Sequence, residues 1–216
     1  MVTLYGAGTF TNKTVAETND GSCSNWTSGT GYGGNTVTKP GRGIHTDNNG
    51  GIGGVADIIQ NNQVSNSTAG GYGIWVFAPY LPVQVKDNTV SNVDVGLTCA
   101  GQQVPATVLF SGNTVDGQNK IGSTGVYITT DLFGFGTSDV SVNFMNNFIK
   151  NNTDGFYLES EAGNTLNLVA NNNSITANSN TNVTQGVGAS GSGTFNLNME
   201  CNWWGTAVSS AIAVTI

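Results

Sequence analysis

The stretch VQVKDNTV, residues 83–90, joins an alternation of apolar and polar residues to a short Asn-Thr-Val turn. Such alternation is typical of a half-buried β-strand. Asparagine suits tight turns because its short side chain tolerates left-handed backbone geometry. The same arrangement, an Asn followed by any residue and then usually by Val or Ile, recurs along the chain, and this recurrence predicts the fold.

Six copies of the pattern follow one another at similar intervals. They are QNNQV (60–64), KDNTV (86–90), SGNTV (111–115), MNNFI (145–149), NNNSI (171–175) and CNWWG (201–205). The shared residues, which we call the ladder asparagines, are Asn62, Asn88, Asn113, Asn147, Asn173 and Asn202, separated by 26, 25, 34, 26 and 29 residues. A second series, a glycine followed by an apolar residue, starts at Gly43, Gly73, Gly96, Gly125, Gly155 and Gly186.

Each period therefore holds a strand, an Asn turn, a second strand, a variable loop and a third strand that opens at the glycine. Periods of about 20 to 50 residues indicate a repeat architecture, and three short strands per period indicate a β-solenoid. In stacked coils the asparagine amides can bond one another as a ladder. The repeat is absent from residues 1–40, which we expect to form an irregular N-terminal segment or cap.

The repeat resembles the right-handed parallel β-helix of the pectate-lyase-like superfamily, over roughly residues 40–205. This resemblance implies an all-β, three-sheet, right-handed parallel β-helix of about six coils in residues 41–216. The ending CNWWGT (201–206) resembles the last coil of secreted surface proteins of Bacteroidetes-type bacteria. A secreted or cell-surface bacterial location is therefore expected. Because further sequence follows that coil in those proteins, we also expect the domain to be truncated at its C-terminus.

Composition excludes several classes of function. Six Lys and Arg residues in a chain of net charge −7 disfavour nucleic acid as a partner. No apolar run reaches the roughly 18 residues of a membrane helix, so membrane insertion is not expected. The odd number of cysteines at irregular spacing forms neither a disulfide framework nor a metal site, and the pairing of Cys23, Cys99 and Cys201 stays open.

Metal and cofactor sites are not expected. The single histidine excludes a His-rich site. Acidic side chains could bind Ca²⁺ through oxygen ligands, but the spacing of a calcium-binding loop is absent.

The register of the repeat assigns side chains to the core or to the surface, because successive residues of a strand face opposite ways. Trp204 aligns with the inward Val and Ile residues, so it should close the core of the last coil, whereas Trp203 should be partly exposed. Cys99 falls on an inward position. One outward column contains His45, Trp75, Thr98, Tyr127 and Tyr157, and Arg42, Asp131, Glu159 and Glu161 lie at or beyond its edges.

In the resembled superfamily the corresponding sheet lines the saccharide-binding cleft. The resemblance thus implies polysaccharide contact by Arg42, His45, Trp75, Tyr127 and Tyr157, which we call the aromatic strip. Packing of aromatic neighbours across strands is the competing interpretation. The leading interpretation is a structural or adhesive module that binds polysaccharide, or a cell-surface glycan, along this strip without turnover.

Two alternatives remain open. The first is a carbohydrate-active enzyme, a polysaccharide lyase or a glycoside hydrolase, with Asp131, Glu159 and Glu161 as candidate acids. A hydrolase needs two carboxylates about 5–9.5 Å apart, and these residues follow neighbouring strands. The second is a subunit that self-associates end to end into filaments, through strand pairing at the ends of the stack.

Overall fold

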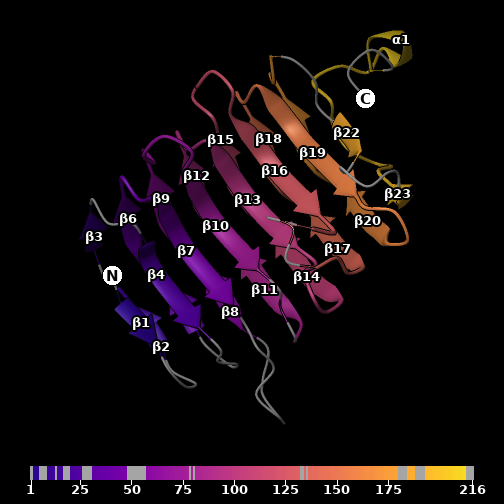
Figure 1. Ribbon diagram of the computed structural model, residues 1–216. Coiled ribbons are helices and arrows are strands. Elements are labelled where there is room, and N and C mark those ends of the chain that lie inside the picture. The colour runs from indigo at the N-terminus through magenta and orange to yellow at the C-terminus, as the bar shows by residue number, and fades with distance from the viewer. Residues whose placement is uncertain are drawn as a thin grey trace.

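In this computed structural model, three parallel sheets wind around a common core, and the strands follow one another from the N-terminal to the C-terminal end of the stack (Figure 1). The structure describes residues 2–4, 9–12, 14–16, 20–25, 31–47, 57–77, 79, 81–131, 134, 136–179, 184–187 and 193–212. Within this part of the chain the only helix is α1 (Ser209–Ile212). The predicted all-β parallel solenoid with three sheets is confirmed.

The strands of each sheet are three elements apart in the sequence, so each coil contributes one strand to each sheet, except that the last described coil meets sheet C only through a single bridge at Trp203. Sheet A contains β1 (Val2–Leu4), β4 (Asp20–Asn25), β7 (Arg42–Asp47), β10 (Tyr72–Phe77), β13 (Val95–Ala100), β16 (Thr124–Thr129), β19 (Asp154–Ser160) and β22 (Thr184–Val187). Sheet B contains β2 (Thr9–Thr11), β5 (Gly31–Gly33), β8 (Ile58–Gln60), β11 (Val83–Lys86), β14 (Ala106–Ser111), β17 (Val140–Met145), β20 (Thr165–Asn171) and β23 (Thr194–Asn198). Sheet C contains β3 (Thr14–Ala16), β6 (Thr36–Thr38), β9 (Gln63–Ser65), β12 (Thr89–Ser91), β15 (Thr114–Asp116), β18 (Phe148–Lys150) and β21 (Ser174–Thr176).

The first forty residues differ from the irregular cap expected from the sequence. Their described strands, β1 to β6, pair in parallel within all three sheets and continue the stack. Asn35-Thr36-Val37 in fact carries the repeat pattern, and it adds a ladder asparagine that the sequence alignment missed. From residue 41 on, sheets A and B each have six described strands, which fits the expected six coils.

The asparagine ladder is confirmed. Each ladder asparagine donates from both its backbone N and its Nδ2 to the Oδ1 of the ladder asparagine one coil further on, at 2.8–3.1 Å. The donors are Asn35, Asn62, Asn88, Asn113, Asn147 and Asn173, and the last acceptor is Asn202. One amide oxygen thus accepts hydrogen bonds from two donors of the preceding turn, of which the backbone N would otherwise be buried without a partner.

In each turn the residue with left-handed backbone geometry is the one before the ladder asparagine. The expectation that the ladder asparagine itself adopts this geometry is wrong. The φ angles at these preceding positions lie between 54° and 68°. The residues are Gly34, Asn61, Asp87, Gly112, Asn146, Asn172 and Cys201. Because the reversal happens one residue earlier, the ladder side chain is free to point into the stack.

The core contains the side chains that the register assigned to it. Ile44, Ile74, Leu97, Val126 and Phe156 are fully buried, as is Cys99. Val187 was also expected inside, but its side chain lies outside the described residues. Trp204 is 9% exposed and Trp203 is 52% exposed, so the predicted inward and outward roles of the two tryptophans are confirmed.

Close packing requires a glycine at the second position of the sheet A strands β7, β10 and β13. A Cβ added at Gly73 would collide with the carbonyl oxygen of Gly96 and with Cγ1 of Val90 on sheet C. Gly43 and Gly96 meet the equivalent atoms one coil away. The absence of a side chain at these glycines therefore allows sheets A and C to pack closely against each other.

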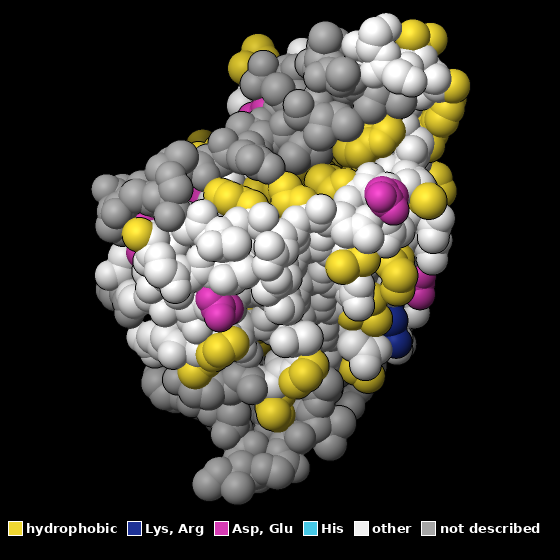
Figure 2. Space-filling view, turned by 90° about the vertical axis from the view of Figure 1, so that its right-hand side faces the viewer, with side chains coloured by type: hydrophobic (Ala, Val, Ile, Leu, Met, Phe, Trp, Pro, Cys, Tyr) yellow, Lys and Arg dark blue, Asp and Glu magenta, His cyan; other side chains and the backbone are white. Residues whose placement is uncertain are grey.

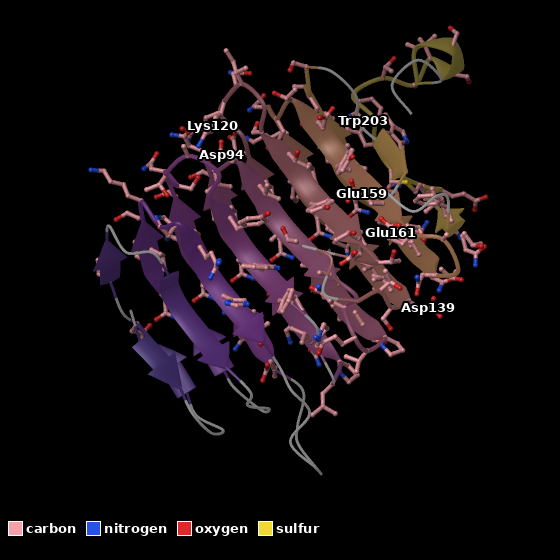
Figure 3. All side chains as sticks on the ribbon, viewed as in Figure 1. Asp94, Lys120, Asp139, Glu159, Glu161 and Trp203 are labelled. Atoms are coloured by element: carbon pink, nitrogen blue, oxygen red, sulfur yellow. The ribbon has the colours of Figure 1, made fainter. Side chains whose placement is uncertain are left out.

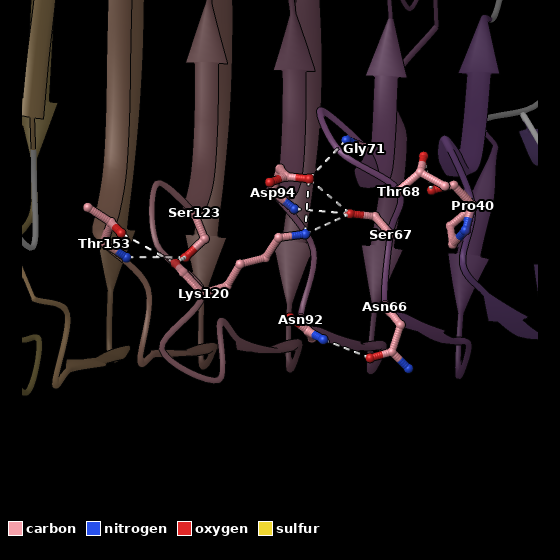
Figure 4. Close-up of polar contacts among 10 residues, drawn as sticks. All are labelled: Pro40, Asn66, Ser67, Thr68, Gly71, Asn92, Asp94, Lys120, Ser123 and Thr153. Carbon is pink, nitrogen blue, oxygen red and sulfur yellow. Dashed lines mark hydrogen bonds and ion pairs between the residues drawn. The ribbon is translucent and has the colours of Figure 1, made fainter.

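A polar network ties three coils together at the turn between sheets C and A (Figure 4). The Nζ of Lys120 lies 3.0 Å from Oδ2 of Asp94 and 3.4 Å from Oγ of Ser67, and each of these residues belongs to a different coil. The same Asp94 oxygen accepts a hydrogen bond from the backbone N of Gly71 at 3.2 Å. The network fixes the spacing of these turns.

Candidate functional site

The outward column of sheet A is assembled in the predicted register. Strand pairing places His45 beside Trp75, Trp75 beside Thr98, Thr98 beside Tyr127, and Tyr127 beside Tyr157. The two halves of the column, before and after Thr98, differ in their surroundings.

The N-terminal half is a packed cluster rather than an open platform. The ring of His45 stacks on Trp75 with centroids 4.4 Å apart, and the Tyr72 and Trp75 centroids are 5.1 Å apart. The guanidinium carbon of Arg42 lies 4.7 Å from the centre of the Trp75 ring, and Phe77 meets that ring edge-on. Trp75 points outward as predicted, but it is only 3% exposed. The packing interpretation therefore describes this half of the aromatic strip.

His45 does not supply a positive charge to this surface. Burial, and then the charge of Arg42, lowers the pKa of His45 to about 3. The imidazole is therefore neutral at physiological pH.

The C-terminal half is more accessible and centres on Glu159. The rings of Tyr127 and Tyr157 are both partly buried, and their centroids are 5.4 Å apart. The hydroxyl of Tyr127 donates a hydrogen bond to Oε2 of Glu159. Burial and then this hydrogen bond raise the pKa of Tyr127, and hydrogen bonding to Glu159, followed by burial, raises the pKa of Tyr157 to about 12. Both phenols therefore stay protonated at physiological pH, and Tyr127 donates its hydroxyl proton to the Glu159 carboxylate.

The carboxylates of the candidate acids Asp131 and Glu159 have hydrogen-bond partners of their own. Glu159 lies in the C-terminal part of β19, and Glu161 follows that strand (Figure 3). The carboxylate of Asp131 accepts a hydrogen bond from the backbone N of Gly134 at 3.0 Å, and its Oδ1 lies 3.5 Å from Nε2 of Gln102. The Asp131 carboxylate therefore bonds within its own loop, and the Glu159 carboxylate accepts the hydrogen bond from Tyr127. Each carboxylate of the expected acid pair already has a partner other than the second acid.

The described residues contain no group of three or more His, Cys, Asp and Glu side chains that could hold a metal ion. Cys99 and Cys201 are free thiols, so neither is paired with Cys23. Burial raises the pKa of Cys99, which keeps that thiol protonated and unreactive.

The outer face of sheet B forms a trough that the sequence analysis did not single out. Two hollows, of about 320 Å³ and about 530 Å³, lie on this face and share Asn167 and Val169, so they form one continuous surface. We call it the sheet B trough. The outward side chains that line it are Gln84, Thr107, Leu109, Ser141, Asn143, Asn167, Val169, Asn196 and Asn198.

No residue that lines the sheet B trough is charged. Amides and hydroxyls alternate with apolar surface, including Val169, which is 40% exposed. Neighbouring amides bond one another across coils: the Nδ2 of Asn196 donates to Oδ1 of Asn167 at 2.9 Å. Among the described residues on the face drawn in Figure 2, the Asp and Glu side chains lie apart from one another. Such a surface suits a neutral ligand that carries many hydroxyl groups and some apolar faces.

A signal for the trough is present in the sequence. In VNFMN (142–146), the apolar Val142 and Phe144 face the core and leave Asn143 outside. The alternation in these strands supports the repeat, but by itself it does not distinguish the outer face of sheet B as a candidate binding surface.

No protein-family model, curated protein or solved structure matches this chain. The parallel solenoid is established by its three sheets, whereas membership of the pectate-lyase-like superfamily, the bacterial surface location and end-to-end self-association stay predictions. Among the described residues no helix has the length and apolarity needed to cross a membrane.

Proposed function

We propose that this chain is a structural or adhesive β-solenoid module of a secreted or cell-surface bacterial protein, and that it binds a neutral polysaccharide along the sheet B trough. The observation that carries the proposal is the continuous, uncharged surface on which the two hollows share Asn167 and Val169. We place the polysaccharide contact on sheet B rather than on the aromatic strip, because the side chain of Trp75 is buried.

The repeat of the protein favours a ligand that also repeats. Strands of the trough are spaced about 4.8 Å apart, which is close to the length of one hexopyranose unit in an extended chain. Five strands line the trough, from β11 to β23. A glycan lying across them can meet a similar set of amide, hydroxyl and apolar groups on each coil.

Charge favours a neutral glycan over an acidic one. The net charge of −7 repels polyanions at long range. Within the trough no Lys or Arg is present to pair with a uronate carboxylate. Neutral amides and hydroxyls, in contrast, can both donate and accept hydrogen bonds with sugar hydroxyls.

Binding without turnover fits the same surface. The trough has no Asp or Glu among its lining residues, and glycoside hydrolysis ordinarily needs two carboxylates beside the scissile bond.

The amide ladder supports a rigid rod, since each turn is bonded to the next through buried groups.

Affinity electrophoresis tests the proposal. The protein should be retarded in gels that contain xyloglucan, mixed-linkage β-glucan or galactomannan, but not in gels that contain polygalacturonate. Asn143→Asp places a carboxylate between Leu109 and Val169, and it should weaken retardation about tenfold, equivalent to about 1.4 kcal/mol. Gln63→Glu makes the same kind of change on an exposed side chain of sheet C and should leave retardation unchanged.

Four results would overturn the proposal. These are retardation by the acidic polymer alone, no retardation by any of the neutral polymers, equal effects of the two variants, and release of reducing ends or unsaturated sugars from the polymers. The last result would instead support the enzymatic alternative.

A further inference from the structure

A second surface, on sheet C, carries two exposed aromatic side chains. Phe148 is 55% exposed, and Trp203 has a similar exposure near the C-terminal end of the stack (Figure 3). Between them lies Ser174, which pairs with Phe148 in the sheet and with Trp203 through a single parallel bridge. We call these three residues the sheet C clamp.

The sheet C clamp lines a hollow of about 320 Å³. The other residues around the hollow include Asn146, Asn172 and Cys201 of the turns, and none of the lining residues is charged. Among the described residues only five large hydrophobic side chains are exposed, and two of them border this one hollow. Concentration of exposed apolar surface at a polar-edged hollow is typical of an interaction site.

The distance between the two aromatic side chains of the clamp determines how thick a ligand must be to contact both of them. Phe148 and Trp203 are two strand spacings apart, about 9.6 Å between their backbones. The small Ser174 side chain leaves the space between them open. A pyranose chair is thick enough to approach both aromatic side chains, whereas a flat heterocycle is thinner and would contact them less completely.

The chemistry of the hollow also matches a sugar ring. The face of an aromatic ring is electron-rich, so it attracts the polarised C–H groups on the apolar face of a pyranose. The Ser174 hydroxyl and the exposed amides of Asn146 and Asn172 lie at the same hollow and can bond ring hydroxyls. The absence of charge among the lining residues favours a neutral sugar.

We propose that the sheet C clamp is a second carbohydrate site, which binds one neutral hexopyranose ring, such as the end or a branch of a glycan. The site goes beyond the sheet B trough, because it lies on another sheet and uses other residues. It does not depend on binding in the trough.

Tryptophan fluorescence gives a direct test. Trp75 and Trp204 are buried, so among the tryptophans with described side chains a ligand-induced change should come from Trp203. Methyl glucopyranoside, methyl galactopyranoside and methyl mannopyranoside are titrated in turn, and at least one should give a saturable change. Trp203→Ala should remove the change, and Phe148→Ala should weaken binding about tenfold, or about 1.4 kcal/mol.

Ser174→Ile fills the space between the aromatic side chains without removing either of them, and it should abolish the saturable change. Isoleucine is favoured in strands, so this variant should fold. Thr89→Ile introduces the same side chain into the same outward column of sheet C, two strands from Phe148, and should bind like the wild type. Circular dichroism of both variants checks that the fold is retained.

Several results would overturn the clamp. They are the absence of a saturable change with all three glycosides, wild-type binding by Ser174→Ile, a response to adenosine but not to sugars, and a dimer in sedimentation experiments that Trp203→Ala dissociates. Asn143→Asp should retain the fluorescence response even where retardation by polysaccharide is lost. Failure of the trough and failure of the clamp are therefore distinguishable.

Discussion

Replacing a central ladder asparagine should cost a large part of the stability of the solenoid. Asn113 is fully buried. Its Oδ1 accepts hydrogen bonds from the backbone N and the Nδ2 of Asn88, and its Nδ2 donates to the carbonyl of Val85 and to Oδ1 of Asn147, all at 2.9–3.0 Å. Asn113→Ala removes all four of these hydrogen bonds.

The magnitude follows from which partners keep another bond. The Nδ2 of Asn88 still donates to the carbonyl of Ile59, and Oδ1 of Asn147 still accepts from the backbone N of Asn113. The backbone N–H of Asn88 loses its acceptor, and the carbonyl of Val85 loses a donor. Each buried group left unsatisfied costs about 1–3 kcal/mol. We expect a loss of about 4 kcal/mol, against a total stability of about 5–15 kcal/mol for a typical domain.

Urea unfolding, followed by far-ultraviolet circular dichroism and by tryptophan fluorescence, measures the loss. Asn196→Ala is the matched control, because Asn196 also donates across coils to an asparagine, Asn167, but is exposed. Water replaces that bond, so the control should lose less than about 1 kcal/mol. Equal losses in the two variants, or a loss below about 1 kcal/mol for Asn113→Ala, would refute the assigned role of the buried ladder.

Three further predictions test other parts of the structure. Lys120→Met removes the ion pair with Asp94 and should lower the free energy of unfolding by about 0.5–1 kcal/mol, with a smaller difference in high salt; an unchanged urea midpoint at low salt contradicts this. Because the pKa of Tyr157 is raised from 10.0 to about 12, its contribution to stability is present below pH 10 and is lost as the pH rises from 10 to 12. Glu159→Gln should move the spectroscopic titration of Tyr157 back toward the ordinary value, and a titration that stays in place argues against Glu159 as the cause of the raised pKa. Gly73→Ala should cost about 1–3 kcal/mol or more in urea unfolding, since its methyl group has no room between sheets A and C; a variant as stable as the wild type contradicts the close packing.

The sequence alone was enough to predict the solenoid and the side of each strand that faces the core. An apolar residue two positions after each ladder asparagine, as at Val90 and Val115, reports a local alternation that any strand obeys. The same alternation predicted that Trp204 faces the core and that Trp203 faces outward. The pattern is weakest in residues 1–40, where Asn35-Thr36-Val37 is its single copy and the flanking residues offer few apolar positions to mark the register.

Only the tertiary structure decided which outward side chains reach solvent. Trp75 and Trp203 both occupy outward positions, yet Trp75 is covered by His45, Tyr72 and Arg42 while Trp203 stays exposed. The partners of Asp131 and Glu159 and the continuity of the sheet B trough were equally invisible in the sequence. The direction of a side chain follows from its place in its own strand, but its exposure and its partners depend on residues one or more coils away, whose lateral position no local pattern encodes.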